Sequence, residues 1–341
     1  MSLDTSIATT RLTRTTFPGL VGVELRRLWW RRLTKVVIAL TVVLTGVTLY
    51  GAYQSTSPDA IAERLQNYRQ TVAQFPQMLQ DCQRAEAQAR ESGDTAADFG
   101  CSQLTAPTPQ EFGLESPQAA DLTVSMAGTN AYLYAFLAFA LGASFIGAEF
   151  SSGSLGTWLT FEPRRLRVAG AKLLAGGLGG GAVAALGLTV TALGAWLVSQ
   201  VNRPDPALSL PTGSGGDESV TQLLIRCLVA AVLTGAGGVA LGLIVRNTGV
   251  IVGIVLGYGV IVEGLLAQAL GHGRLVPWLP LKNLQAFVER GSTYFTEVCT
   301  ADGCHMEPMR VSYTHGWVYL LVVGIALLTV ALAIFRRRDV G

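Results

Sequence analysis

The feature that most constrains this chain is a set of long stretches without Asp, Glu, Lys or Arg. They occupy 36–53, 122–148, 173–202, 227–245 and 311–335, and a further run, 247–273, is interrupted only by Glu263. A helix of about 20 mainly apolar residues crosses the roughly 30 Å hydrocarbon core of a bilayer. Charged residues make up 14% of the 341, whereas soluble domains contain about 25%. Because backbone in lipid must satisfy its own hydrogen bonds, we predict an all-α integral membrane protein with six transmembrane helices.

The order of segments follows from these runs. We expect spans at 36–53, 122–148, 173–200, 223–245, 248–270 and 313–335. Between them we expect an arm with an amphipathic interface helix (1–35), a helical insert (54–121), a loop (149–172), two further loops (201–222 and 271–312) and a tail (336–341). In 271–312, Pro277, Trp278 and Pro280 precede a short amphipathic stretch, which predicts re-entrant or interfacial helices before the last span.

Basic residues are concentrated in the arm, in the loop after the second span and in the tail. By the positive-inside rule, these segments and both termini are cytoplasmic, and 54–121, 201–222 and 271–312 are external. A cleaved signal peptide is the rival interpretation of the first span. The charged leader is too long, the apolar run is too extended and no A-x-A-like site follows, so we predict an uncleaved anchor.

The arm contains an amphipathic pattern at 18–33. One helical face holds Val21, Leu25, Leu28 and Trp29, and the other holds Glu24, Arg27 and Arg31. This pattern predicts a helix on the membrane surface, with Trp29 and Trp30 at the headgroup boundary and the arginines near anionic lipid. The alternative is an ordinary basic flank beside the first span.

The insert begins with a helix signal, because Ser57 and Pro58 are typical of an N-cap and a first turn. Apolar residues then recur every three or four positions from Ile61 to Leu79. This stripe predicts a helix, kinked near Pro76, that packs on another external helix.

Cysteines occur in two of the predicted external segments, as Cys82 and Cys101 in one and Cys299 and Cys304 in the other. An oxidising exterior favours two disulfides, although four cysteines allow three pairings. A metal site at Cys299, Cys304 and His305 is an alternative that lacks a clear fourth ligand. Cys227 lies inside a span, where packing is its expected role.

Catalytic motifs are missing from the sequence. It contains no P-loop, no H-E-x-x-H and no G-x-S-x-G, and its histidines, His272, His305 and His315, are scattered. We therefore predict no catalytic residues, no metal and no cofactor bound by this chain. Glu263 is the one acid well inside a span, where it either contacts a cation or a proton or reaches headgroups or Arg274.

Glycines recur every fourth residue at Gly249, Gly253 and Gly257 in the fifth span and at Gly238 and Gly242 in the fourth. Small residues at this spacing let helices approach closely. The ridges serve either the hairpin of these two spans or a dimer contact.

The segment between the second and third spans, 149–172, reads EFSSGSLGTWLTFEPRRLRVAGAK. It resembles the ABC-2 family of ABC transporter permeases, which share an E-F, a G-[ST] three residues after the Phe, a P-x-R and a Lys entering the third span. The matching residues are Glu149, Phe150, Gly153, Ser154, Leu155, Leu159, Pro163, Arg165 and Lys172. The family often has a basic residue where this chain has Ser152.

The resemblance implies a permease subunit of a bacterial plasma-membrane exporter that forms a dimer, most simply a homodimer, and docks two separate ATP-binding subunits. ATP and Mg would bind to those partners. A short helix after Gly153 would dock on the partner, with Gly156 allowing close approach and Trp158 and Leu159 as apolar anchors. Glu149 would hold the loop by pairing with Arg165 or by capping backbone amides. The plain alternative is a positive-inside loop with a turn at Pro163.

In this interpretation the substrate path lies between two copies, along the second and fifth spans. Its candidate lining is aromatic, with Tyr132, Tyr134, Phe136 and Phe139, and Glu263 is a further candidate. Such a lining suits an amphiphilic small molecule such as a drug, a lipid or a peptide, and not a nucleic acid, although aromatics at this spacing equally suit packing. The competing hypotheses are a transporter or channel driven by ion gradients through Glu263, and a membrane-anchored sensor or enzyme built on the insert.

Overall fold

The computed structural model describes residues 16–92, 99–109, 111–114, 118–161, 164–203, 219–266, 273–300 and 303–337. Within them, six helical segments are long and apolar enough to cross a membrane. They are α2 (Arg32–Ser55), α4 (Ala119–Ser151), α6 (Arg165–Val201), α7 (Val220–Val245), α8 (Thr248–Gly257) continued by the π-helical η2 (Tyr258–Leu266), and α11 (Tyr313–Arg337). The chain is therefore a multi-pass membrane protein, and each predicted span overlaps one of these segments. The bounds differ most at α6, which begins eight residues before the predicted 173 and takes up part of the predicted loop 149–172, and residues 267–270 of the predicted fifth span lie outside the described residues.

The remaining elements are shorter or more polar. They are α1 (Phe17–Trp29), α3 (Pro58–Glu91), η1 (Cys101–Gln103), α5 (Ser154–Phe161), η4 (Val276–Trp278), α10 (Pro280–Val288), β1 (Gly291–Thr300) and β2 (Gly303–Ser312). Two of the spans are longer than a bilayer requires. With 33 and 37 residues, α4 and α6 measure about 50 and 55 Å at 1.5 Å per residue.

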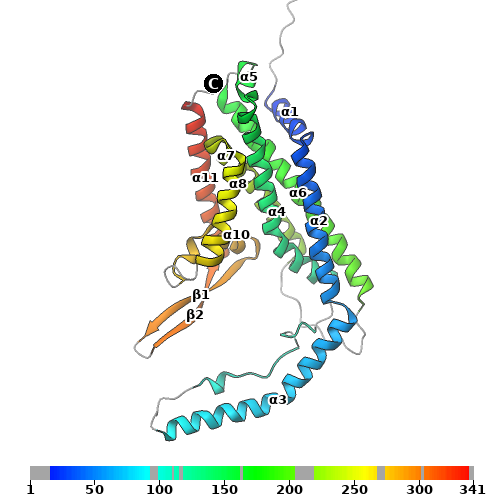
Figure 1. Cartoon of the computed structure of the whole chain (residues 1–341), viewed down its shortest axis with the longest axis vertical. Coiled ribbons are helices and arrows are strands. Elements are labelled where there is room, and N and C mark those ends of the chain that lie inside the picture. Colours follow the sequence, from blue (N-terminus) through cyan, green and yellow to red (C-terminus); the bar gives the residue numbers. More distant parts are fainter. Residues whose placement is uncertain are drawn as a thin grey trace, which may run out of the picture. The chain divides into compact units, whose positions relative to one another are not determined.

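The chain divides into two compact units, one of 1–42, 128–187 and 223–341 and the other of 43–127 and 188–222. In the first unit, α1, α5 and the end of α11 lie at one end (Figure 1). Its main core contains Phe145 of α4, Leu155 of α5, Val183 of α6, Leu243 of α7 and Phe335 of α11. Burial of these side chains joins five helices around one apolar centre.

Glycines let α4 and α7 approach closely. A Cβ on Gly142 of α4 would collide with the carbonyl oxygen of Gly235 of α7, and one on Gly238 would collide with that of Phe139. A Cβ on Gly253 of α8 would meet nothing within 4 Å. The glycines of the fourth span therefore serve a contact with α4, a third possibility beside the hairpin with α8 and the dimer contact that the spacing suggested.

The second unit contains α3 and the segment that follows it. Ser57 caps α3 as predicted, since its hydroxyl accepts a hydrogen bond from the backbone N–H of Ala60 at 3.3 Å. The helix continues through Pro76 and is not straight (Figure 1). Its stripe does not pack on another helix as predicted, because the ring of Tyr68 meets that of Phe112 edge to face, with centroids 5.5 Å apart. Phe112 belongs to the segment after α3, described at 99–109 and 111–114, which we call the return segment and in which the short 3-10 helix η1 is the only described helix.

The predicted loop 271–312, with its re-entrant or interfacial helices, also contains two strands that the prediction missed. After η4 and α10, strands β1 and β2 form an antiparallel two-stranded sheet, with Gly291 opposite Ser312 and Cys299 opposite Cys304. The stretch from Thr293 to Val298 is rich in β-branched and aromatic residues. These residues fit a pleated surface better than a helix.

Candidate functional site

The segment that carries the family resemblance forms a sharp turn followed by the short helix α5. Gly153 has a φ of +68°, and its N–H donates to the carbonyl of Phe150 at 3.3 Å. A left-handed residue after a helix is a common C-terminal cap, and glycine adopts it without strain. The turn ends α4 and starts α5 within three residues, so that α5 lies next to the end of the span.

Directly beside this turn lies a cluster of buried charges from three helices. The ammonium Nζ of Lys172 in α6 lies 2.8 Å from Oε1 of Glu24 in α1 and 2.7 Å from Oε2 of Glu149 in α4. These three side chains are at most 1% exposed. Arg27 and Arg31 lie 3.5 and 3.6 Å from Oε1 of Glu149. We refer to these five residues as the charge cluster.

The arginines of the charge cluster also attach it to neighbouring backbone and rings. Arg31 donates to the carbonyl oxygens of Ser144 and Phe145, at 3.2 and 3.0 Å. Burial lowers the pKa of Arg31 while Glu149 raises it, although an arginine stays protonated at any physiological pH. The guanidinium of Arg27 lies 5.3 Å from the ring centroid of Trp158 in α5. This cation–π contact joins α5 to α1.

The structure changes the interpretation of the arm. Leu20, Glu24 and Leu28 form the buried stripe of α1, so its acidic residue faces the protein and not the membrane surface. The reason is electrostatic, because Lys172 supplies a buried counterion at the same level. Trp29 and Trp30 are exposed, which suits the headgroup boundary predicted for them.

The charge cluster can couple the positions of the elements that contribute to it. A buried charge that loses its partner destabilises a protein strongly, so α1, α4 and α6 cannot separate here without a large cost. Phe150, next to Glu149, also lies under the guanidinium of Arg246 at the α7–α8 turn, 4.8 Å from it. The residues Glu149 and Phe150, which precede the α4–α5 turn, therefore contact α1, α6 and the α7–α8 turn.

The described residues that were predicted to couple to a partner come from the end of α4, the turn, α5 and the start of α6. Glu149 is buried in the charge cluster, Gly153 makes the turn, Ser154 begins α5, Gly156 and Trp158 are half-buried in it, and Arg165 begins α6. The side chain of Leu159, and Pro163, lie outside the described residues. On α5 itself, Thr157 and Thr160 are exposed.

The sequence did not predict that Glu24, Arg27 and Arg31 would belong to this site. The available signal was the position of Glu24, four residues from both Leu20 and Leu28 on one helical stripe. An acid in line with two leucines indicates a buried carboxylate, which requires a cation from elsewhere in the fold. Lys172 was identified only as part of the family pattern.

The candidate path residues of α4 have different surroundings. The hydroxyl of Tyr132 donates to Oε1 of Glu289 at 3.0 Å, and Phe136 is half-buried. Phe139 is buried and packs with Ile251 of α8. Tyr134 is fully buried against Gly187. Packing therefore accounts for Tyr134 and Phe139, whereas Tyr132 and Phe136 are partly accessible.

Glu263 has a structural partner that the sequence did not suggest. Its carboxylate accepts hydrogen bonds from the backbone N–H of Leu281, at 3.0 Å, and of Lys282, at 3.3 Å. These groups belong to the first turn of α10, where backbone donors have no partner within the helix. Glu263 thus caps α10 from the π-helix η2.

Cysteines in the two predicted external segments form disulfides. Cys82 and Cys101 are joined by a disulfide, as the first of the two local pairs predicted, and Cys227 is free and buried. Cys299 is also disulfide-bonded and lies opposite Cys304 in the β1–β2 register. A disulfide sulfur carries no thiolate charge, so the alternative metal site at Cys299 loses a ligand.

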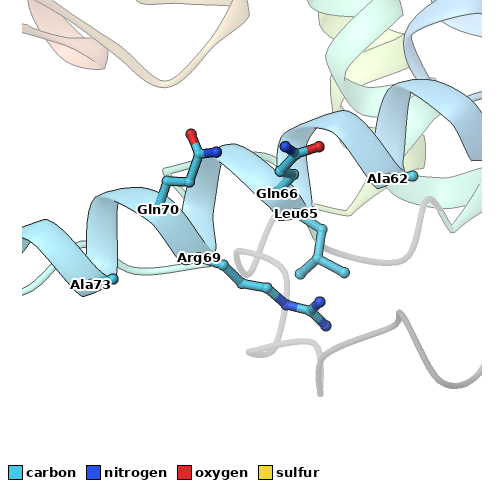
Figure 2. A pocket seen from close by; sticks show the side chains of 6 residues that line it. All are labelled: Ala62, Leu65, Gln66, Arg69, Gln70 and Ala73. Atoms are coloured by element: carbon cyan, nitrogen blue, oxygen red, sulfur yellow. The ribbon is translucent and has the colours of Figure 1, made fainter.

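A depression lies along one stretch of α3. Its described lining residues, Ala62, Leu65, Gln66, Arg69, Gln70 and Ala73, all come from consecutive turns of that one helix (Figure 2). Figure 2 shows Leu65 and Arg69 directed to one side and Gln66 and Gln70 to the other. Side chains that diverge in this way do not converge on a ligand.

A scan against models of known protein families and a search of curated proteins both give no match to this chain.

Proposed function

We propose that this protein is the membrane-spanning subunit of an ATP-driven exporter, that it works as a dimer, and that α5 docks on a separate ATP-binding subunit. The partner binds and hydrolyses ATP with Mg. The observation that carries the proposal is α5 itself, a short helix between two spans whose base is joined to a buried charge cluster.

The connection between α5 and the spans supports a coupling role. Leu155 is 1% exposed in the main core, and Trp158 contacts Arg27, so α5 is anchored on its inner side. Its exposed side presents Thr157 and Thr160 to solvent. A force applied to that side by a closing partner would pass through Glu149 and Lys172 into α4 and α6. Rocking of two such subunits would open a path outward.

Purification of the protein from its native host, together with any separate ATP-binding subunit that accompanies it, tests the proposal. We expect the two proteins to elute together and to transport an amphiphilic compound in an ATP-dependent manner in vesicles. Thr157→Arg should weaken the association by about a hundredfold, because burying an unpaired charge in a contact costs several kcal/mol. Thr105→Arg, at an exposed threonine of the return segment, is the matched control.

A second variant separates docking from coupling. Glu149→Gln should leave the association intact and reduce transport per ATP hydrolysed, because it removes the negative charge shared by Lys172, Arg27 and Arg31. Equal association of wild type and Thr157→Arg, or transport without any ATPase, would overturn the proposal.

The second candidate function is ion-driven transport through Glu263. The capping of α10 by its carboxylate accounts for this acid without an ion or a proton, and the observation favours a structural role for it. ATP-independent transport that Glu263→Gln abolishes would support this second function.

A further inference from the structure

A groove runs along the junction of α1 and α2 where they meet α6, within the first unit. Its walls include Leu25 and Trp29 of α1, Thr34 of α2, and Leu178, Ala182 and Val183 of α6, and Arg26 lies at its rim. Its volume is about 320 Å³, roughly ten times the 30 Å³ that a water molecule occupies in the liquid. It is therefore large enough for a chain of several carbon atoms.

The walls of the groove are apolar. Leu28 and Val183 at its base are 2% and 3% exposed, whereas Trp29 and Leu178 are 59% and 50% exposed. Gly179 makes the base, because a Cβ there would collide with Leu28. An open recess on the apolar surface of a span must be filled, since an empty one forfeits dispersion contacts along its whole lining.

The rim of the groove carries positive charge. Arg27 and Arg31 are turned into the charge cluster, but Arg26 is exposed and has no carboxylate partner among the residues that the structure describes. Arg32 and Lys35, near Thr34 in the sequence, are exposed as well, although neither is among the residues that line the groove. The nearest acid along the chain, Glu24, is buried and paired with Lys172. This rim attracts an anion at the level where the span α2 begins.

We infer that the groove binds one acyl chain of an anionic phospholipid and that Arg26 pairs with its phosphate. Lipid tails are as apolar as leucine, so the chain alone gives little preference over bulk lipid. The charge on Arg26 supplies the preference, and the recess fixes the position of the chain. Trp29 at the mouth suits the headgroup boundary. This inference goes beyond the proposed function and does not depend on it.

Native mass spectrometry of the delipidated full chain in detergent tests the inference, with phosphatidylglycerol and phosphatidylcholine of identical acyl chains as probes. We expect one phosphatidylglycerol to bind more tightly than phosphatidylcholine. Arg26→Gln should lower the affinity for phosphatidylglycerol by about fivefold, the effect of removing one basic residue near an anionic surface. Ala182→Phe should fill the recess and remove binding of both lipids.

Two controls match these variants. Arg69→Gln removes an exposed arginine from α3, and Leu186→Phe adds an aromatic ring to an exposed position of α6 outside the groove. Neither should change lipid binding. Equal binding of the two lipids to wild type, an unchanged preference in Arg26→Gln, or bound lipid retained in Ala182→Phe would each overturn the inference. None of these measurements involves ATP or transport.

Discussion

Two carboxylates in apolar stretches of this protein, Glu149 and Glu263, are stabilised in different ways. Glu149 lies 2.7 Å from the ammonium of Lys172 and within 3.6 Å of two arginines, with 1% of its side chain exposed. Glu263 has no such cation among the described ion pairs and accepts instead from two backbone N–H groups of α10. One acid joins three helices through charge, whereas the other caps a single short helix.

The two carboxylates differ in how many helices depend on them for stability. A buried carboxylate held by cations leaves those cations uncompensated when it is lost, so its removal affects every contributing helix. A carboxylate held by amides leaves only the first turn of one helix without a cap. Charge inside an apolar segment is therefore a weak guide to function until its partner is known.

The largest effect should come from Lys172→Met, which leaves Glu24 and Glu149 buried without their shared cation. We expect the free energy of unfolding to fall by about 3 to 5 kcal/mol, measured by denaturant titration of the purified protein in a mild detergent. Lys35→Met removes an exposed lysine and serves as the control. A similar loss of unfolding free energy in the two variants would show that the charge cluster contributes no more to stability than an exposed lysine does.

A smaller effect is expected at the second carboxylate. Glu263→Ala should cost about 1 kcal/mol, as removal of a helix cap does, and should speed amide hydrogen exchange in α10. Glu263→Gln should cost less, because the amide oxygen still accepts a hydrogen bond from Leu281. If either variant destabilised the protein as much as Lys172→Met does, the contrast between the two acids would be wrong.

The smallest effect concerns the edge of the charge cluster. Trp158→Leu removes the ring beside Arg27 and should cost about 0.5 to 1 kcal/mol, the range for a partly exposed cation–π contact. Faster hydrogen exchange confined to α5 would report it. Trp158→Phe should recover part of the protection, and Trp196→Leu, at an exposed tryptophan of α6, should change nothing in α5.

The spans were predictable because the bilayer imposes a length and a composition. The expected 223–245 and 313–335 differ by at most three residues at either end from α7 and α11. The cap of α3 at Ser57 was also predictable, because a serine followed by a proline is a local signal for the start of a helix. The hairpin of β1 and β2 was missed, although β-branched and aromatic residues are frequent in β1, because the prediction for this segment rested on apolar length and helical periodicity.

The site was only partly predictable. Glu149, Gly153 and Lys172 stand out in the sequence as a motif. A glycine at position 153 also has a local explanation, because the backbone there is left-handed. Glu24 lies 148 residues from Lys172, however, and no local pattern relates the two. Their pairing depends on how α1 packs along α6.

The sequence by itself determined that this is a multi-pass membrane protein and where its spans lie, because crossing lipid depends on the length and polarity of each segment alone. Only the tertiary structure decided which charges are buried together. Glu24 and Arg27 belong to a predicted surface helix, and their counterions come from α4 and α6. An ion pair between distant segments depends on how those segments pack. For that reason the members of the charge cluster that lie in α1 could be identified only in the folded chain.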